Sequence, residues 1–395
     1  TEGDFDVWEI FGAVSVPVLA DMRFAEELTI DGSYRYSDYD LDVGSTDSWA
    51  YGGVWAPFED IRFRGTRSRA VRAPNIFELF RPQEQGSFNL DIEVCDTASI
   101  ESLRLSDPET AAQREANCAA DPLVGPNFTN PLTSQFSGIT GGNPGLSEET
   151  ADTWTYGFVL EPRFAQGFVF TLDYWKIEIE DAIQELQDTD IMRGCYDGPG
   201  LDPTFCNLIG RVDDQGSAFF GGLNSLQTGQ INFAKIETEG WDFEALYDFE
   251  ELPFIPGSMT LRLNGTYLDK FEEFRSTLNP NLADDERGEL RRPKWSGNFS
   301  ARYYFNDLTL NYRLAYVDDQ LARNVENNER SSVDNSDLSE LYRHDIAVDY
   351  VFNDTINIYG GINNFTDEDP YRTEPSFPTG PRGRYMYMGV TLRFQ

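Results

Sequence analysis

The sequence predicts an all-β protein that crosses a membrane as an antiparallel β-barrel. Three observations indicate this fold class. Apolar and polar residues alternate with a period of two in many segments of the 395-residue chain. Every second connection between these segments is short, whereas the others are long. No stretch approaches the roughly 18 uncharged apolar residues that a transmembrane helix needs.

The alternation gives each predicted strand one apolar and one polar face. In segment 150–162, Trp154, Tyr156 and Phe158 alternate with Thr153 and Thr155. The aromatic residues stand mostly at the ends of the apolar faces, as interfacial girdles require. The same reading places thirteen strands at residues 5–20, 23–38, 46–57, 60–71, 150–162, 167–180, 234–249, 257–270, 294–306, 308–318, 341–353, 355–363 and 384–395.

Connection length favours a membrane barrel over a soluble sandwich or a solenoid. The short connections are predicted at residues 19–22, 57–60, 161–164, 251–254, 306–307 and 353–354. The long ones follow residues 71, 180, 270, 318 and 363. Short periplasmic turns on one side and long extracellular loops on the other are typical of outer-membrane barrels.

Strand 60–71 departs from the pattern. Arg67 and Arg69 fall on the same parity as Phe63 and Val71, which the alternation assigns to the lipid. We therefore expect this strand to carry a bulge or to rise above the bilayer.

Composition narrows the function classes. The net charge of −37 argues against nucleic-acid binding, because such a surface repels phosphate. A strongly negative charge is typical of a heavily solvated surface. The alternatives are a protein that selects cations, divalent ions that bridge the protein to lipid head groups, and a saline habitat. His344 is the sole histidine, so a multi-histidine zinc site is excluded. The start of the chain, residues 1–6, lacks the features of a signal peptide.

We predict neither a metal site nor a cofactor. The acidic stretch 38–44 superficially resembles a calcium loop, but Gly44 is one place late and Trp49 stands where the twelfth position needs a ligand. A looser surface calcium site is the alternative. His344 shares the parity of apolar residues, so we expect an interfacial place for it rather than the base of a hydrolase.

The four cysteines fall as two local pairs, Cys95 with Cys118 and Cys195 with Cys206. Neither pair has zinc-knuckle or redox-motif spacing. We expect two disulfides in exported loops, with free buried thiols as the alternative.

Several segments resemble the barrel of TonB-dependent outer-membrane receptors. Segment 72–80 (RAPNIFELF) resembles the family signature, and 142–152 (GNPGLSEETAD) resembles its re-entry from loop to strand. Segment 361–367 (GINNFTD) resembles the part before the final loop. The last strand, with Phe394, is similar to the C-terminal signal that the barrel assembly machinery recognises.

The resemblance implies a bacterial outer-membrane location and a barrel of about 22 strands. It also implies an N-terminal plug domain that contacts the TonB complex. We expect residues 1–395 to be one domain, the C-terminal portion of the barrel, without the plug. Further expected partners are outer-membrane lipid and lipopolysaccharide, the assembly machinery and a small nutrient ligand.

Candidate ligand-binding residues lie in the loops at the mouth. They are Arg72, Asn75, Phe77, Phe88, Phe136, Phe219, Phe220, Tyr371 and Arg372. The alternative is structural: Pro74 ends the strand, Asn75 caps a short turn and Glu78 pairs with an arginine, while most of the aromatic side chains pack the loops together.

The predicted function is active import of a scarce nutrient. The ligand is a siderophore-type iron chelate, cobalamin or an oligosaccharide, and the protein is not an enzyme. A passive outer-membrane pore or surface-binding protein is the alternative. An outer-membrane hydrolase that uses His344 is more remote.

Overall fold

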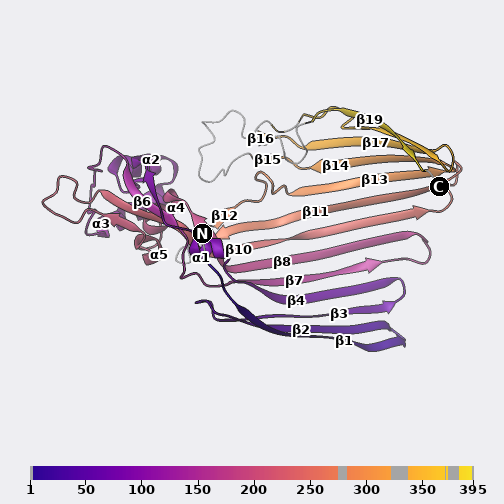
Figure 1. Ribbon diagram of the computed structural model, residues 1–395, viewed down its shortest axis with the longest axis horizontal. Coiled ribbons are helices and arrows are strands. Elements are labelled where there is room, and N and C mark those ends of the chain that lie inside the picture. The colour runs from indigo at the N-terminus through magenta and orange to yellow at the C-terminus, as the bar shows by residue number, and fades with distance from the viewer. Residues whose placement is uncertain (1–2, 275–282, 322–336, 370, 372–381, 394–395) are drawn as a thin grey trace.

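The computed structural model describes residues 3–274, 283–321, 337–369, 371 and 382–393. These residues form one large, mainly antiparallel sheet with a compact group of helices and short strands at one end (Figure 1). A separate pair of short strands, β15 (Gln320–Leu321) and β16 (Asp337–Leu338), lies at the same end. None of the described helices combines the length and the apolar character needed to cross a membrane.

Thirteen long strands make the wall, as the alternation predicted. Neighbours along this series pair antiparallel, and no described residue of β1 pairs with β19. The strands are β1 (Val7–Met22), β2 (Ala25–Tyr39), β3 (Ser45–Phe58), β4 (Ile61–Arg72), β7 (Glu149–Leu160), β8 (Phe168–Leu186), β10 (Leu223–Phe249), β11 (Ser258–Phe274), β13 (Trp295–Phe305), β14 (Leu308–Val317), β17 (Leu341–Val351), β18 (Ile356–Asn363) and β19 (Tyr385–Leu392).

The two faces of the wall differ as predicted. On one face, Phe299 of β13 lies opposite Leu314 of β14 and Leu263 of β11. On the other, Arg64 of β4 makes a bidentate ion pair with Asp173 of β8 at 2.8 and 2.6 Å. We call these the apolar face and the polar face.

Short turns gather at one end of the sheet and long connections at the other (Figure 1). The prediction of segregated loop lengths is thus confirmed. The first turn was misplaced: it lies at residues 23–24 rather than 19–22. A register shift between Pro17 and Leu19 adds one residue to β1, and Phe24 closes the turn with a positive φ of 65°.

Of the two explanations expected for strand 60–71, a bulge or a rise above the bilayer, the bulge is wrong. β4 pairs with β7 without interruption from Ile61 opposite Leu160 to Arg72 opposite Glu149. The irregularity lies instead in β3, between Trp55 and Phe58, beside the short turn. Arg67 therefore shares the apolar face with Phe63.

The two longest connections, predicted only as long loops, are folded. The first contains α1 (Ile76–Phe80), β5 (Glu84–Phe88), a 3-10 turn (Leu90–Ile92), α2 (Thr97–Ser106), α3 (Pro108–Ala120) and β6 (Phe136–Gly141). The second contains α4 (Asp188–Tyr196), α5 (Pro203–Cys206) and β9 (Ile209–Arg211). A short strand, β12 (Ala283–Asp285), follows β11.

Local sequence explains where the cap helices begin. The Asp96 carboxylate accepts a hydrogen bond from the Ala98 N–H at 2.8 Å and starts α2. The Asp107 carboxylate accepts one from the Thr110 N–H at 3.0 Å, and Pro108 occupies the first turn of α3. These signals were present in the sequence, but neither helix carries a strong apolar stripe, so a period-two pattern does not reveal them.

Candidate ligand-binding region

Residues 73–148 and 187–222, which we call the loop cap, pack around one hydrophobic core. The core draws on both connections and on the adjoining ends of β8 and β10. Its fully buried members include Ile191, Met192 and Leu226. The core's other buried residues include Ile92, Val94, Ile100, Phe128, Phe136, Leu186, Tyr196, Phe205 and Leu223. This core makes the loop cap a folded unit rather than two independent loops.

Both predicted disulfides are present. Cys95 bonds to Cys118, and Cys195 bonds to Cys206. Each disulfide closes a segment within one connection, so neither joins the two connections to each other. Besides the shared hydrophobic core, side-chain ion pairs and hydrogen bonds join the two connections.

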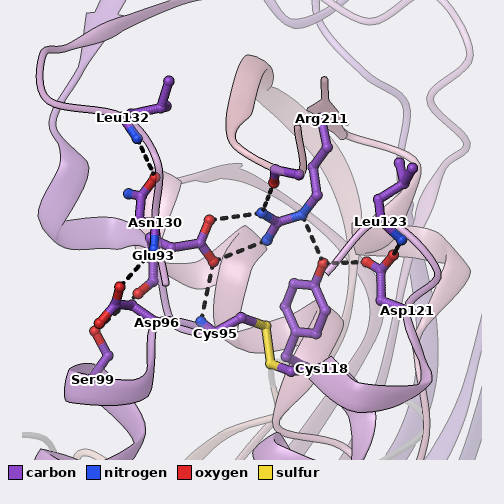
Figure 2. A network of polar contacts seen from close by, with 12 residues as sticks. Glu93, Cys95, Asp96, Ser99, Cys118, Asp121, Leu123, Asn130, Leu132 and Arg211 are labelled. Carbon is purple, nitrogen blue, oxygen red and sulfur yellow. Dashed lines mark hydrogen bonds and ion pairs between the residues drawn. A yellow bond between two sulfur atoms is a disulfide. The ribbon is translucent and has the colours of Figure 1, made fainter. Parts of the chain in front are cut away.

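One link is the buried ion pair of Glu93 with Arg211 (Figure 2). The guanidinium donates to the two carboxylate oxygens at 2.7 and 2.9 Å, and both side chains are at most 2% exposed. Arg211 also donates to the Gly221 carbonyl at 2.8 Å. The Cys95 N–H donates to Glu93, so the pair adjoins the first disulfide. A charge buried this deeply needs several such partners.

Tyr196 extends this network. Its hydroxyl donates to Asp121 at 2.6 Å and accepts from Arg211 at 3.2 Å. Burial raises the pKa of the Tyr196 hydroxyl; the Arg211 charge opposes the rise and the hydrogen bond to Asp121 adds to it. Burial alone would lower the pKa of Arg211, but hydrogen bonds and the charge of Glu93 raise it. The network therefore keeps the hydroxyl neutral and the guanidinium charged.

A second buried ion pair joins the same two connections. Arg114 of α3 donates to both oxygens of Asp197 at 2.6 and 2.7 Å, and each side chain is 7% exposed. Beside it, the Asn117 amide donates to the carbonyls of Tyr196 and Gly198, both at 2.8 Å. The second connection is thereby held against α3 from several directions.

Sequence reasoning did not single out these pairs. The partners lie 118 residues apart for Arg211 and Glu93, and 83 apart for Arg114 and Asp197. A single sequence offers no signal at such separations. Within each connection, the two cysteines close in the chain were the feature that indicated a compact fold.

Arg72 lies where the wall meets the loop cap. It forms ion pairs with Glu78 of α1 and Glu149 of β7. The Asn75 side chain accepts from the N–H groups of Phe77 and Glu78, while Glu78 accepts from the Asn75 N–H at 2.8 Å. This capping box and the Glu78 ion pair are the structural roles that the alternative interpretation assigned to the segment.

The two family-like segments around the first connection contact each other. The Gly142 N–H donates to the Arg81 carbonyl at 2.9 Å, and the Asn143 N–H donates to the Glu78 carbonyl at 2.8 Å. Leu79 packs in a small buried cluster with Leu146 and Ile183. The last residues of the first connection, 142–146, therefore hold its first helix, α1, against the wall.

The aromatic residues predicted to contact the ligand differ in burial: some are packed inside the protein and others are exposed. Phe88 stacks on Phe136 at 5.7 Å, and Phe136 belongs to the cap core. Tyr371 is buried, and its hydroxyl donates to the Ser339 carbonyl at 3.0 Å. Arg372 lies outside the described residues. Phe77 and Phe219 are half exposed and Phe220 is partly buried.

His344 and the acidic stretch 38–44, the other features considered in the sequence, make contacts within the protein. His344 lies on the apolar face opposite Leu314, and its Nδ1 is 2.8 Å from the Tyr312 hydroxyl. In the acidic stretch, Asp40 accepts a hydrogen bond from the Asp6 N–H. Among the described residues, no group of three or more His, Cys, Asp or Glu side chains is arranged to hold a metal ion.

A polar recess of about 270 Å³ lies on the polar face between β13, β14 and β17. Arg313 donates to Asn298 at 3.0 Å, and Arg343 forms an ion pair with Asp345, also in the lining, at 3.3 Å. Val317 and Leu341, at the loop ends of their strands, close the recess toward the loop side. Its two guanidinium groups can bind an anionic oxygen-rich group.

Comparison with known proteins identifies related folds. The family model for the TonB-dependent receptor-like β-barrel matches residues 2–365. No curated protein sequence matches the chain.

Solved structures with the same fold include a mutant of the ferric enterobactin receptor PfeA from Pseudomonas aeruginosa in complex with enterobactin, with 15% identity and a TM-score of 0.61. That alignment covers 98% of this chain and 45% of the receptor. The siderophore receptor PirA from Acinetobacter baumannii has 15% identity and a TM-score of 0.61, with 100% and 47% covered. The FrpB iron transporter from Neisseria meningitidis has 16% identity and a TM-score of 0.51, with 93% and 43% covered. The chain spans less than half the length of each of these proteins.

Proposed function

Because the chain belongs to the TonB-dependent receptor-like β-barrel family, we propose that it forms part of the wall and the mouth of a receptor that imports a scarce nutrient. Members of this family are transport receptors of the bacterial outer membrane, not enzymes. The observation that carries the proposal is the division of the molecule into a two-faced wall, short turns at one end and a folded loop cap at the other.

The proposed ligand is a ferric siderophore. The similar solved structures include receptors for such chelates, although a likeness at 15% identity extends to the fold alone. Within this chain, the recess with Arg313 and Arg343 offers two guanidinium groups to an anionic chelate. They supply local positive charge on a chain whose net charge is −37.

The loop cap supplies the outer contacts in this proposal. Phe77 and Phe219 are the most exposed of the predicted aromatic contacts, and the Arg81 guanidinium lies 5.3 Å from the centre of the Phe77 ring. The buried or paired candidates, Phe136 and Arg72, would act by holding the loop cap in place rather than by touching the ligand.

The other expected partners belong to the same proposal. Among the described residues, β1 pairs only with β2 and β19 only with β18, so their outer edges would pair with further strands and close the barrel, with residues 1–395 as its C-terminal portion. The receptor's plug domain would fill the lumen and contact the TonB complex. Outer-membrane lipid, lipopolysaccharide and the barrel assembly machinery would be its membrane partners.

Uptake of radiolabelled ferric siderophores tests this proposal. The full-length protein is expressed in a bacterium that lacks its own receptors, with and without a working TonB complex. We expect TonB-dependent uptake, and we expect Arg313→Gln combined with Arg343→Gln to reduce it at least about tenfold through lost charge-assisted contacts.

Arg302→Gln is the matched control. Arg302 lies on the same face, nearer the short turns, and donates to Asn311 at 2.6 Å. Uptake of cobalamin or an oligosaccharide instead would contradict the siderophore proposal but would still support an import receptor. Constant ion conductance without TonB-dependent uptake would favour the passive pore.

A further inference from the structure

The two faces of the wall exchange character beyond a row of aromatic side chains on the apolar face. Tyr156 of β7, Tyr174 of β8 and Trp241 of β10 begin this row as cross-strand neighbours, and it continues through Tyr267 and Trp295. Such a row marks the level at which a membrane meets water. The parts of β7, β8, β10 and β11 on the loop side of the row therefore lie outside the proposed membrane.

On the loop side of this row, the continuation of the apolar face is charged. Lys176 pairs with Glu178 at 2.7 Å, and Lys270 pairs with Glu237 at 2.6 Å. The Arg67 guanidinium carbon lies 5.7 and 5.1 Å from the ring centres of tryptophans on β3 and β7. Charged side chains are mostly found where a surface meets water, so this side of the strands is solvated.

The opposite side of the same strands carries apolar residues. Trp175 follows Asp173 of the polar face by two residues, and the alternation then places apolar side chains at every second position of β8. Ile179 lies opposite Ile236. All members of this set are partly exposed. We call them the inner apolar patch: Trp175, Ile177 and Ile179 of β8, Ile236 of β10 and Phe271 of β11.

Small residues beside the inner apolar patch leave it open. The Trp175 ring lies over Gly240 of β10, where an added Cβ would come within 2.8 Å of the ring. On the other side, Thr153 and Ala151 of β7 lie opposite the two isoleucines of β8. None of these neighbours is large enough to cover the isoleucine side chains.

Charged residues border the inner apolar patch on β11. Glu273 lies opposite Ile236 and pairs with Arg292 at 3.8 Å. The Arg292 guanidinium carbon lies 4.2 Å from the centre of the Phe271 ring. By strand geometry, the patch extends about 13 Å along β8 and about 10 Å across β8, β10 and β11. An apolar surface with a polar rim is typical of a binding site.

The inner apolar patch adjoins the recess that contains Arg313 and Arg343. Both lie on the polar face, and the last member of a line of cross-strand partners on that face lines the recess. The line starts two residues from Gly240, over which Trp175 lies. Three strand spacings, about 14 Å along the sheet, separate β10 from β14. The members of the line are Asp242, Thr266, Ser296 and Val317.

We propose that the nutrient is an amphiphilic ferric siderophore, whose anionic iron-binding head occupies the recess and whose fatty acyl tail lies on the inner apolar patch. The proposal rests on the proposed function and names the class of its substrate. Covering the isoleucines with a hydrocarbon tail removes apolar surface of both partners from water. The receptor's plug is the alternative cover. The position of the patch, beside the recess and on the loop side of the aromatic row, favours the ligand.

Binding of two matched ferric chelates tests this proposal. They share one carboxylate-bearing hydroxamate head group and differ only in carrying an acetyl or a decanoyl tail. The full-length protein is expressed in a bacterium that lacks its own receptors and a working TonB complex, so that binding is measured without transport. Cell-bound radioactive iron is corrected with a receptor-free strain. We expect the wild type to bind the decanoyl chelate at least about tenfold more tightly than the acetyl chelate.

Substitutions in the inner apolar patch should remove this preference. Ile177→Thr combined with Ile179→Thr should weaken binding of the decanoyl chelate about tenfold and leave binding of the acetyl chelate unchanged. Threonine keeps the β-branched shape that suits a strand but loses apolar contact. Ile236→Thr tests the neighbouring strand in the same way.

Val169→Thr is the matched control. Val169 lies on the same face of β8 as the patch, but near the short turns. Its substitution should leave the preference for the decanoyl chelate unchanged. Recovery in the outer-membrane fraction checks that each variant assembles.

The outcomes separate this proposal from the function on which it rests. Equal affinity of the wild type for both chelates would overturn the amphiphilic class but leave the siderophore function intact. A tail preference that survives Ile177→Thr combined with Ile179→Thr would also overturn the proposal, because the tail would then bind elsewhere. An equal loss of both chelates in an assembled variant would assign the patch to the plug or the fold and overturn it. Failure of assembled wild type to bind either chelate would refute the siderophore function itself.

Discussion

Charged residues far apart in the sequence hold the loop cap together. Glu93 and Arg211 are almost completely buried, as are Arg114 and Asp197. Removing one member of such a pair leaves an uncompensated charge and costs about 3–5 kcal/mol, whereas replacing both members with apolar residues is often neutral. These pairs therefore specify which surfaces of the two connections meet.

Glu93→Gln should loosen the loop cap. The substitution keeps the size of the side chain but leaves Arg211 charged and buried, so we expect a local loss of about 3–5 kcal/mol. Hydrogen exchange of residues 188–211 in the full-length protein measures the effect.

Glu115→Gln is the corresponding control in the same connection. Glu115 pairs with Arg104 at 2.8 Å, but both side chains are more than 40% exposed, so the loss should be at most about 1 kcal/mol. Equal effects of the two substitutions would contradict the structural role assigned to the buried pair.

Asp107 should make the stability of α3 depend on pH. Hydrogen bonds from the Thr110 hydroxyl and N–H lower the pKa of the Asp107 carboxyl from its ordinary value of 3.8. A lowered folded-state pKa gives stability that is fully present above the unfolded value and is lost as pH falls through the folded value. The protection factors of residues 108–120, which correct amide exchange for its intrinsic pH dependence, should therefore fall as the solution is acidified below about pH 4.

The Asp107→Asn variant tests the source of this dependence. Asparagine is also a good N-cap residue, so α3 should still form at neutral pH. Its exchange should lose the acid-dependent component that Asp107 contributes. An unchanged pH profile would show that other carboxyl groups control the helix.

Among the elements, the strands were predictable and the cap helices were not. Alternation located all thirteen long strands because each strand has one apolar and one polar face. β10 extends beyond its predicted start at residue 234, since its outer part pairs with β6 and β9 of the loop cap rather than following the membrane pattern. The helices α2 and α3 take their places from long-range packing in the cap core.

The junction between the wall and the loop cap depends on Gly142. A Cβ at this position would lie 2.6 Å from the Arg81 backbone nitrogen and 2.7 Å from the Leu79 carbonyl oxygen. Gly142→Ala should force this backbone apart and destabilise the junction by about 1–3 kcal/mol. Faster proteolysis or amide exchange of residues 76–82 would reveal the change.

Gly145→Ala is the control for this substitution. Its added Cβ would approach only the Asn143 side chain, at 3.4 Å, which is ordinary contact. We expect little change in the junction. If Gly142→Ala also leaves exchange unchanged, the close approach of the two segments does not stabilise this end of the wall.

For the whole molecule, the two faces of the wall predict a labelling pattern in a bilayer. On β13, Phe299 lies on the apolar face and Ser300 on the polar face. A spin label at Phe299→Cys should be accessible to oxygen dissolved in lipid, whereas one at Ser300→Cys should be accessible to a water-soluble relaxing agent. The same accessibility at both positions would argue against a wall that separates lipid from a polar interior.

The wall, the division between turns and loops, and both disulfide pairings can be predicted from local residue patterns. These features depend on a period-two pattern, on connection length and on cysteines close in the chain. The loop cap and the surroundings of Arg67 became apparent only in the folded molecule. Glu93 meets Arg211 across 118 residues, and Arg67 lies between rings from two other strands. Such contacts depend on strand register and on packing between distant segments, which local residue patterns do not specify.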